Sequence, residues 1–187
     1  MTNSDASIAR IGCSAKLIKF ENLPDGRIMT ISKGEGRFRI VKLIGKDPYF
    51  KGLVEWIHDK PLVGDEEERA KELEKEVWIK LEDVIRLINK LYNKEIKIRD
   101  LIEDAVLPEE MGMEKEKGVD GSMVERRMRF SFAVSQILDL GMKEQQRLLQ
   151  CTSTIKRLEK QNGLLGVARQ HLAAQVTLKD ALDNKKN

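Results

Sequence analysis

The chain has 187 residues, 41% of them hydrophobic and 35% charged, which is typical of one globular domain built in two parts. Its 34 basic and 31 acidic residues leave a formal net charge of +3, a balance that does not indicate a nucleic-acid-binding protein. No apolar run approaches the ~20 residues of a membrane span. The start, MTNSDASIAR, has no apolar core of the kind found in secretory signals. We therefore expect no membrane partner.

The first third of the chain has the residue pattern of β-strands. A first strand is expected from Ile8 to Phe20, where apolar and polar residues alternate. Three further runs are rich in β-branched and aromatic residues: Ile28–Ile31, Phe38–Leu43 and Tyr49–Ile57. Because alternate strand residues point the same way, Phe50, Val54 and Trp56 should share one face of the last run with Gly52.

Glycine-containing segments predict the turns between these strands. In Pro24-Asp25-Gly26, proline presets φ, aspartate bonds its own backbone and glycine accepts a positive φ. Gly34 and Gly36 predict a second sharp bend, and the segment 45–48 predicts a third. The strands should therefore form an antiparallel sheet.

The helical pattern begins at Asp65. Apolar residues recur at steps of three and four from Ala70 to Leu91, and acidic residues crowd the first turn, where the helix dipole favours them. Residues 93–110 mix strand-like and helix-like spacing, so their structure stays open. The glycine-dotted, charged stretch 111–122 is interpreted as a flexible connection.

Three helices are expected in the last third of the chain. The first two span Arg129–Leu140 and Lys143–Cys151, and Ser153 or Thr154 should cap the third. From Cys151 to Val176 apolar residues follow a heptad spacing typical of a coiled coil, which should pack within the chain rather than form a dimer. Gly163 and Gly166 predict a break in this seam, because each costs about 1 kcal/mol relative to alanine in a helix.

Several short motifs in the chain follow one another in the order and spacing of a known family. They are GCSA, LPDGR, GEGRFRI, PYF and VEWIHD, at residues 12–15, 23–27, 34–40, 48–50 and 54–59. Together with RFSFAVSQILDLGMKEQQRLLQCTSTIKRL at residues 129–158, they resemble the Lon N-terminal domain. That domain is the substrate-binding module at the front of ATP-dependent Lon proteases, and it also occurs alone.

The resemblance implies an α+β fold. It places an antiparallel β-subdomain, similar to the pseudo-barrel of PUA domains, at residues 1–60. A long helix and flexible connection follow at 61–122, and a helical subdomain, or bundle, at 123–187. Members of the family normally begin with an earlier proline- and leucine-rich strand, so we expect the β-subdomain to be N-terminally incomplete. The resemblance also implies an intracellular location, with plastids as one compartment used by stand-alone members.

The residues needed for catalysis are missing from the pattern. Gly45-Lys46 is followed by Asp47, so it does not form a phosphate-binding loop. Asp120-Gly121-Ser122 only faintly resembles the Lon serine motif, and no matching lysine segment accompanies Ser122. The two cysteines and two histidines match no metal spacing. We therefore expect no enzyme activity, no cofactor, no metal and no catalytic residue.

The function implied by the resemblance is non-enzymatic recognition of polypeptides, either unfolded clients or a protein partner. A sheet face or open strand edge suits this role, because it accepts extended segments by strand addition and apolar contact. The candidate contact residues are Tyr49, Phe50, Val54 and Trp56. Taken singly, each of these residues is more simply interpreted as part of the core.

Two alternative functions stay open. One is an RNA-binding, PUA-like module that uses the basic C-terminal half, including Arg126, Arg127 and Arg129. Its basic residues are not interleaved with aromatic side chains on which bases would stack, so nucleic acid is not the expected partner. The other is a fragment of an ATP-dependent Lon protease.

Overall fold

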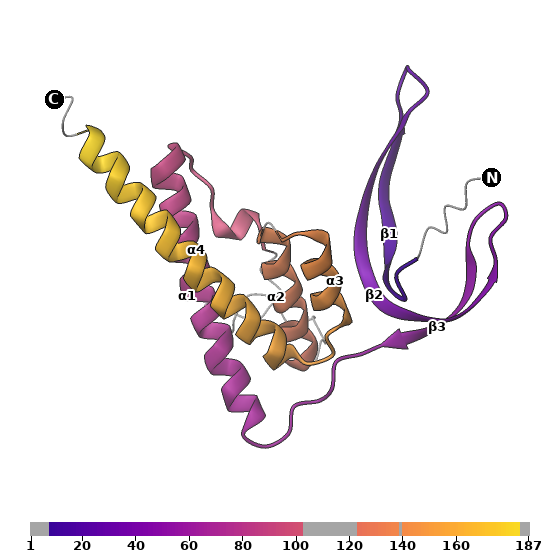
Figure 1. Ribbon diagram of the computed structural model, residues 1–187. Helices are drawn as coiled ribbons and strands as arrows, with labels where there is room; N and C mark the ends of the chain where they lie inside the picture. Colours follow the sequence, from indigo (N-terminus) through magenta and orange to yellow (C-terminus); the bar gives the residue numbers. More distant parts are fainter. Residues whose placement is uncertain (1–7, 103–122, 139, 184–187) are drawn as a thin grey trace, which may run out of the picture. The chain divides into compact units, whose positions relative to one another are not determined.

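The computed structural model describes residues 8–102, 123–138 and 140–183, which belong to two compact units (Figure 1). The first, the β unit, ends at His58 and contains the strands. The second, the helical unit, begins at Asp59 and contains the helices. The predicted α+β class is confirmed. Among the described residues, no helix combines the length and apolarity needed to cross a membrane.

The β unit is a three-stranded antiparallel sheet. Its strands are β1 (Ile11–Asn22), β2 (Ile28–Gly45) and β3 (Lys51–Ile57). The strand order is β1-β2-β3, so β2 lies in the middle and the other two form the edges. Within the described residues the sheet is open, and its closure into a PUA-like barrel stays a prediction.

The turn between β1 and β2 forms as the sequence predicts. Gly26 has a φ of +84°, which its missing side chain permits. The Arg27 backbone N–H donates to Asp25 Oδ1 at 3.1 Å, and Arg27 Nε donates to Asp25 Oδ2 at 2.8 Å. These bonds favour the charged carboxylate and hold the pKa of Asp25 below its ordinary value.

The predicted bend at Gly34 and Gly36 is wrong, because β2 runs through both residues as one continuous strand. Neither glycine has a positive φ. Both instead allow a close approach of neighbouring side chains. A Cβ atom at Gly34 would lie 3.2 Å from Cys13 Sγ, and one at Gly36 would lie 3.0 Å from the Trp56 ring. These glycines therefore serve packing rather than a turn.

The long acidic helix is confirmed as α1 (Glu66–Tyr92). It ends at Asn93, whose left-handed φ of +52° is one that asparagine tolerates well. The open segment beyond it holds only a short 3-10 helix, η1 (Ile98–Asp100), among residues 93–102. The connection predicted at 111–122 lies outside the described residues.

The last third of the chain contains three helices, as predicted. They are α2 (Met123–Ile137), α3 (Met142–Gln150) and α4 (Thr154–Asp183). The predicted cap of the third helix is confirmed, because Ser153 Oγ accepts a hydrogen bond from the Lys156 backbone N–H at 3.3 Å.

The predicted break at Gly163 and Gly166 is wrong, because α4 is continuous through both residues. The helix packs along α1 through its apolar seam, so the prediction that the seam packs within the chain is confirmed (Figure 1). Leu158 and Leu165 are fully buried there. Burial of two leucines at about 1.5–3 kcal/mol each offsets the intrinsic helix penalty of the two glycines.

A buried ion pair fixes the start of the helical unit. The side chain of Asp59 pairs with both terminal nitrogens of Arg157, one of them at 3.0 Å, and both side chains are almost wholly removed from solvent. The same guanidinium donates to the Cys151 carbonyl at 2.7 Å and to Ser131 Oγ at 2.9 Å. Since its partners Asp59, Ser131 and Cys151 lie on three different segments, this one side chain of α4 ties the entry of the unit to α2 and to the connection before α4.

We expect Leu165→Ala to destabilise the helical unit by about 2–5 kcal/mol, because it leaves a cavity between α1 and α4. Val167→Ala on the same helix should change stability by no more than about 0.5 kcal/mol, because Val167 is 68% exposed. Urea unfolding followed by far-UV circular dichroism measures both. Equal midpoints for the two variants would contradict the packing of α4 on α1.

Asp59→Ala should destabilise the same unit by about 3–5 kcal/mol, because it leaves the buried Arg157 charge uncompensated. Asp180→Ala is the matched control, since it removes a carboxylate from the exposed Lys90–Asp180 pair and should cost about 0–1 kcal/mol. The same urea titration applies. A loss at Asp59 no larger than that at Asp180 would show that the ion pair is dispensable.

Candidate functional site

The β unit leaves most of its large apolar side chains exposed. Only Ile11 and Arg37 are buried among its described residues. The exposed apolar residues on the strands are Leu17, Ile18, Phe20, Ile28, Met29, Ile31, Val41, Leu43, Ile44, Leu53, Val54 and Trp56. Soluble proteins rarely expose contiguous apolar patches of more than a few hundred Å² unless the patch binds something. The sheet is therefore the candidate site.

One face of the sheet is built around two aromatic rings. Phe38 on β2 lies directly opposite Trp56 on β3, and their ring centroids are 6.3 Å apart in an edge-to-face arrangement. The next pair in register, Ile40 and Val54, shares this face, because residues opposite one another in a sheet point the same way. We call these four residues the aromatic face.

Glycines lie beneath both rings of the aromatic face. A Cβ atom at Gly12 would come within 2.6 Å of Phe38 Cζ, and one at Gly36 within 3.0 Å of Trp56 Cζ3. Real Cβ atoms essentially never approach to 2.6 Å, so the Phe38 ring would have to move, and at 3.0 Å the Trp56 ring would have to give by a few tenths of an ångström. The two rings therefore rest against the backbone of the neighbouring strand, in space that only glycine leaves free.

The Ser14 side chain hydrogen-bonds to the β2 backbone where the regular pairing of β1 and β2 is interrupted, beside the two rings. Its Oγ accepts a hydrogen bond from the Gly36 backbone N–H at 3.0 Å and donates one to the Gly36 carbonyl at 3.2 Å. These bonds occur where the register of β1 and β2 shifts, between Cys13 and Ala15. The hydroxyl thus satisfies both backbone groups of one residue at an irregular position, and the motifs GCSA and GEGRFRI meet there.

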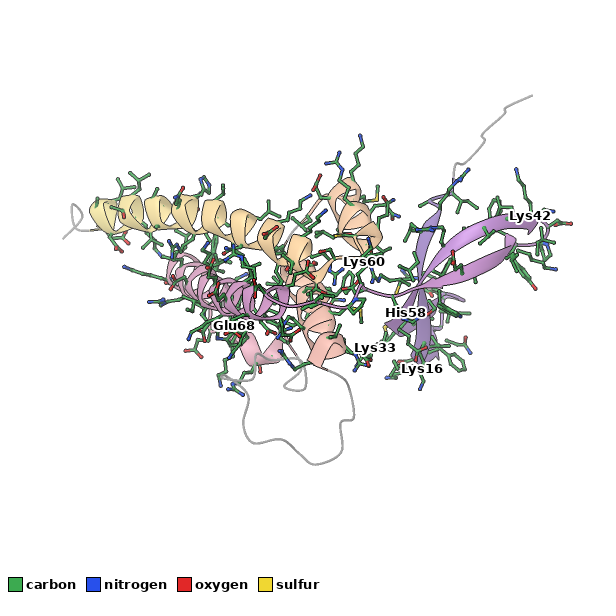
Figure 2. The ribbon with its side chains drawn as sticks, turned by 90° about the horizontal axis from the view of Figure 1, so that it is seen from below. Lys16, Lys33, Lys42, His58, Lys60 and Glu68 are labelled. Carbon is green, nitrogen blue, oxygen red and sulfur yellow. The ribbon has the colours of Figure 1, made fainter. Side chains whose placement is uncertain are left out.

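The opposite face of β2 and β3 is charged. Arg39 lies opposite Glu55, and the two side chains form an ion pair of 3.8 Å. Lys42 lies opposite Leu53 on the same face, on the part of the sheet formed by β2 and β3 (Figure 2). By alternation along β3, Lys51 joins them. We call Arg39, Lys42 and Lys51 the basic face, so the two sides of the sheet differ in chemistry.

The structure brings two of the four predicted contact residues together. Val54 and Trp56 lie on the aromatic face of β3, on the same side as Gly52. Tyr49 and Phe50 precede β3 in its connection to β2, so the alternation predicted for Phe50 does not apply to it. The ammonium of Lys51 lies 5.0 Å from the centre of the Tyr49 ring.

The interpretation of these four residues as core is wrong. Trp56 is 55% exposed, Tyr49 64% and Phe50 50%. Whether a strand residue is buried depends on what covers its face of the sheet, and local sequence does not encode that cover. Sequence reasoning did not assign Phe38 and Ile40 to the site. Aligning the strands in register would have found them, because each lies opposite a predicted residue.

The residues considered for catalysis and metal binding form no site. Within the described ranges, no three His, Cys, Asp or Glu side chains are grouped so as to hold a metal ion. His58 is exposed, and His171 is exposed on α4, where its Nε2 lies 3.1 Å from the Gln175 amide nitrogen. Ser122 lies outside the described residues.

Carboxylates already pair with all three arginines of the RNA hypothesis. Arg126 contacts Glu74 at 2.5 Å, and Arg129 contacts Glu125 at 2.5 Å. Arg127 is buried and contacts Glu67 at 2.8 Å and Glu74 at 3.2 Å. Burial alone would lower the pKa of Arg127, but hydrogen bonds and charge from the two glutamates outweigh it and raise that pKa. Arg126 and Arg127 therefore join α2 to α1, whereas Arg129 pairs within α2 and stays exposed.

Comparison with known proteins gives a consistent set of similarities. The family model described as "ATP-dependent protease La (LON) substrate-binding domain" matches residues 2–166. A Lon protease of Karelsulcia muelleri (strain GWSS) is 42% identical over 62 residues, which are 33% of this chain and 7% of that protease. The chain thus matches a small part of that relative.

One similar solved structure is a Lon N-terminal domain protein from Xanthomonas campestris. It is 17% identical, with a TM-score of 0.45, and the match covers 83% of this chain and 68% of that one.

The two tryptophans provide a direct test of the exposure of the sheet. Trp78 is only 2% exposed, whereas Trp56 is 55% exposed. In Trp78→Phe, the remaining Trp56 should emit at longer wavelength and be readily quenched by acrylamide. In Trp56→Phe, the remaining Trp78 should resist quenching. Both should quench alike in guanidinium, which serves as the control, and similar quenching in native buffer would show that the aromatic face is covered.

Proposed function

The chain belongs to the family of ATP-dependent protease La (LON) substrate-binding domains, and from that premise we propose that it binds polypeptides without catalysing a reaction. The binding partners are unfolded clients or a protein that displays an extended segment. The observation that carries the proposal is the aromatic face, on which Trp56 and Val54 are exposed and Phe38 and Ile40 are half-buried.

The aromatic face supports this role through the hydrophobic effect. Burying apolar surface stabilises a complex by about 25 cal/mol per Å², and aromatic side chains bring the largest area per residue. Trp56 combines a large exposed ring with a position beside a second aromatic side chain. Tryptophan is among the residues that most often dominate binding energy at protein interfaces.

Such a surface favours unfolded over folded partners. Folded proteins place most of their Val, Ile, Leu and Phe side chains inside, whereas an unfolded chain presents them to solvent. An exposed apolar sheet face selects for apolar side chains in general and not for one sequence. A domain of this kind is therefore suited to many clients of unrelated sequence, provided that each exposes apolar side chains.

The proposed role contains no chemical step within this chain. The matched family model describes a substrate-binding domain. The residues expected of a phosphate-binding loop are missing around Gly45-Lys46. Client binding of this kind serves equally in a chain that acts alone and in one that is part of a longer Lon protease, where binding would precede degradation.

We expect the chain to bind a reduced, alkylated and fluorescently labelled client of near-zero net charge with little dependence on salt, because apolar contact releases few ions. Trp56→Ala should weaken this binding at least about tenfold, the effect of a typical interface hot spot. Fluorescence anisotropy between about 50 and 500 mM salt measures both, a range over which the Debye length shortens roughly threefold.

Ile79→Ala is the matched control, because Ile79 is an exposed apolar residue of α1 and should leave client affinity unchanged. Single-stranded RNA is titrated in parallel. An RNA complex whose log K falls with log salt at about −0.7 per phosphate, together with no client binding, would replace this function by RNA binding.

A further inference from the structure

The outer edge of β3 is a regular strand edge. The pairing of β2 with β3 contains two β-bulges. At each bulge β2 advances by two residues while β3 advances by one, so the extra residue lies on β2. β1 itself carries an extra residue, between Leu17 and Lys19. Within the described residues, β3 pairs only with β2. Its seven residues therefore offer an even row of backbone groups.

Most protein sheets protect such an edge. Proline within the strand, a bulge, or a very short strand prevents another chain from adding to it. β3 reads KGLVEWI, which contains no proline, and it has no extra residue of its own. Its charged residues are Lys51 at the start of the strand and Glu55, which pairs with Arg39 within the sheet. A strand that added here would complete the hydrogen bonding of the edge at the usual spacing of about 4.8 Å.

The two sides of β3 favour different kinds of side chain in an added strand. On one side, Val54 and Trp56 would contact apolar side chains of an added strand. On the other side, β3 itself carries Lys51, Leu53, Glu55 and Ile57. Glu55 is paired with Arg39 at 3.8 Å, and Arg39 and Lys42 lie one strand further in. Two strand spacings are about 9.6 Å, slightly more than the Debye length of about 8 Å in physiological salt, so Arg39 and Lys42 attract acidic side chains there only weakly and Lys51 is the nearest cation.

The net charge of the β unit also favours an acidic partner. Residues 8–58 contain ten basic and five acidic residues. Lys16 on β1 and Lys33 on β2 even lie opposite one another in register, and Lys42 lies on the β2–β3 part (Figure 2). A partner for this sheet gains from negative charge, and a second copy of the same basic sheet does not.

We propose that the β3 edge binds an extended polypeptide segment whose residues alternate between apolar and acidic, and that this segment adds as a fourth strand of the sheet. The proposal rests on the proposed polypeptide-binding function and specifies its geometry and its preferred sequence pattern. Apolar residues of the segment face Trp56 and Val54, and acidic residues face the side of Arg39, Lys42 and Lys51.

The test uses the full chain and four labelled peptides measured by fluorescence anisotropy. The first alternates valine and glutamate over seven residues, and the second alternates valine and lysine. The other two are valine–glutamate peptides N-methylated on the odd or on the even residues. Since only alternate N–H groups of a strand face one neighbour, one methylated set should bind at least about tenfold more weakly and the other should not. The valine–lysine peptide should also bind at least about tenfold more weakly, a difference that salt reduces.

Hydrogen exchange locates the site, because residues 51–57 should gain protection with the valine–glutamate peptide. Equal binding of both methylated peptides and their parent would overturn strand addition, and equal binding of the lysine peptide would overturn the charge preference. Binding of the unfolded client without binding of the valine–glutamate peptide would reject this inference and leave the proposed function intact. A dimer in sedimentation that the peptide does not dissociate would assign the edge to a second copy and would also reject it.

Discussion

A three-stranded sheet has two faces and two edges, and the side chains of the β unit are too few to cover them. Small sheets are marginally stable unless another layer buries one face. Here only Ile11 and Arg37 become inaccessible among the described residues of the unit. The aromatic side, the charged side and the regular outer strand all remain available for contact as a result. The candidate site follows from this shortage of cover among the described residues.

The helical unit solves the opposite problem, because it has to accommodate charge inside its core. Removing a guanidinium and a carboxylate from water costs several kcal/mol per ion unless their geometry and hydrogen bonding are excellent. Arg157 meets that condition through Asp59, Ser131 and the Cys151 carbonyl, and its guanidinium also lies over the Phe132 ring at 4.4 Å. The unit is therefore held by specific directional bonds as well as by apolar packing. The ion pair with Arg157 also fixes the position of Asp59, the first residue of the unit.

Features that depend on a few neighbouring residues could be predicted from the sequence. The periodicity of α1, the turn at Asp25-Gly26 and the cap at Ser153 are all local, and all three are confirmed. Features that depend on a partner from elsewhere in the chain could not. Gly36 looks like a bend until Trp56 and Ser14 are placed against it. The exposure of Trp56 likewise depends on which other parts of the chain cover the sheet, and no alternation pattern reports that.

The glycines beneath Phe38 and Trp56 also affect how the sheet would bind. A free aromatic side chain loses rotamer entropy when a partner immobilises it, at about 0.5–1.5 kcal/mol for each flexible side chain. The rings resting on Gly12 and Gly36 are already confined by the backbone below them and by one another. The surface is thus preorganised before any partner arrives. A side chain in place of either glycine would weaken recognition by pushing the ring out of this position, even though no glycine atom need touch the partner.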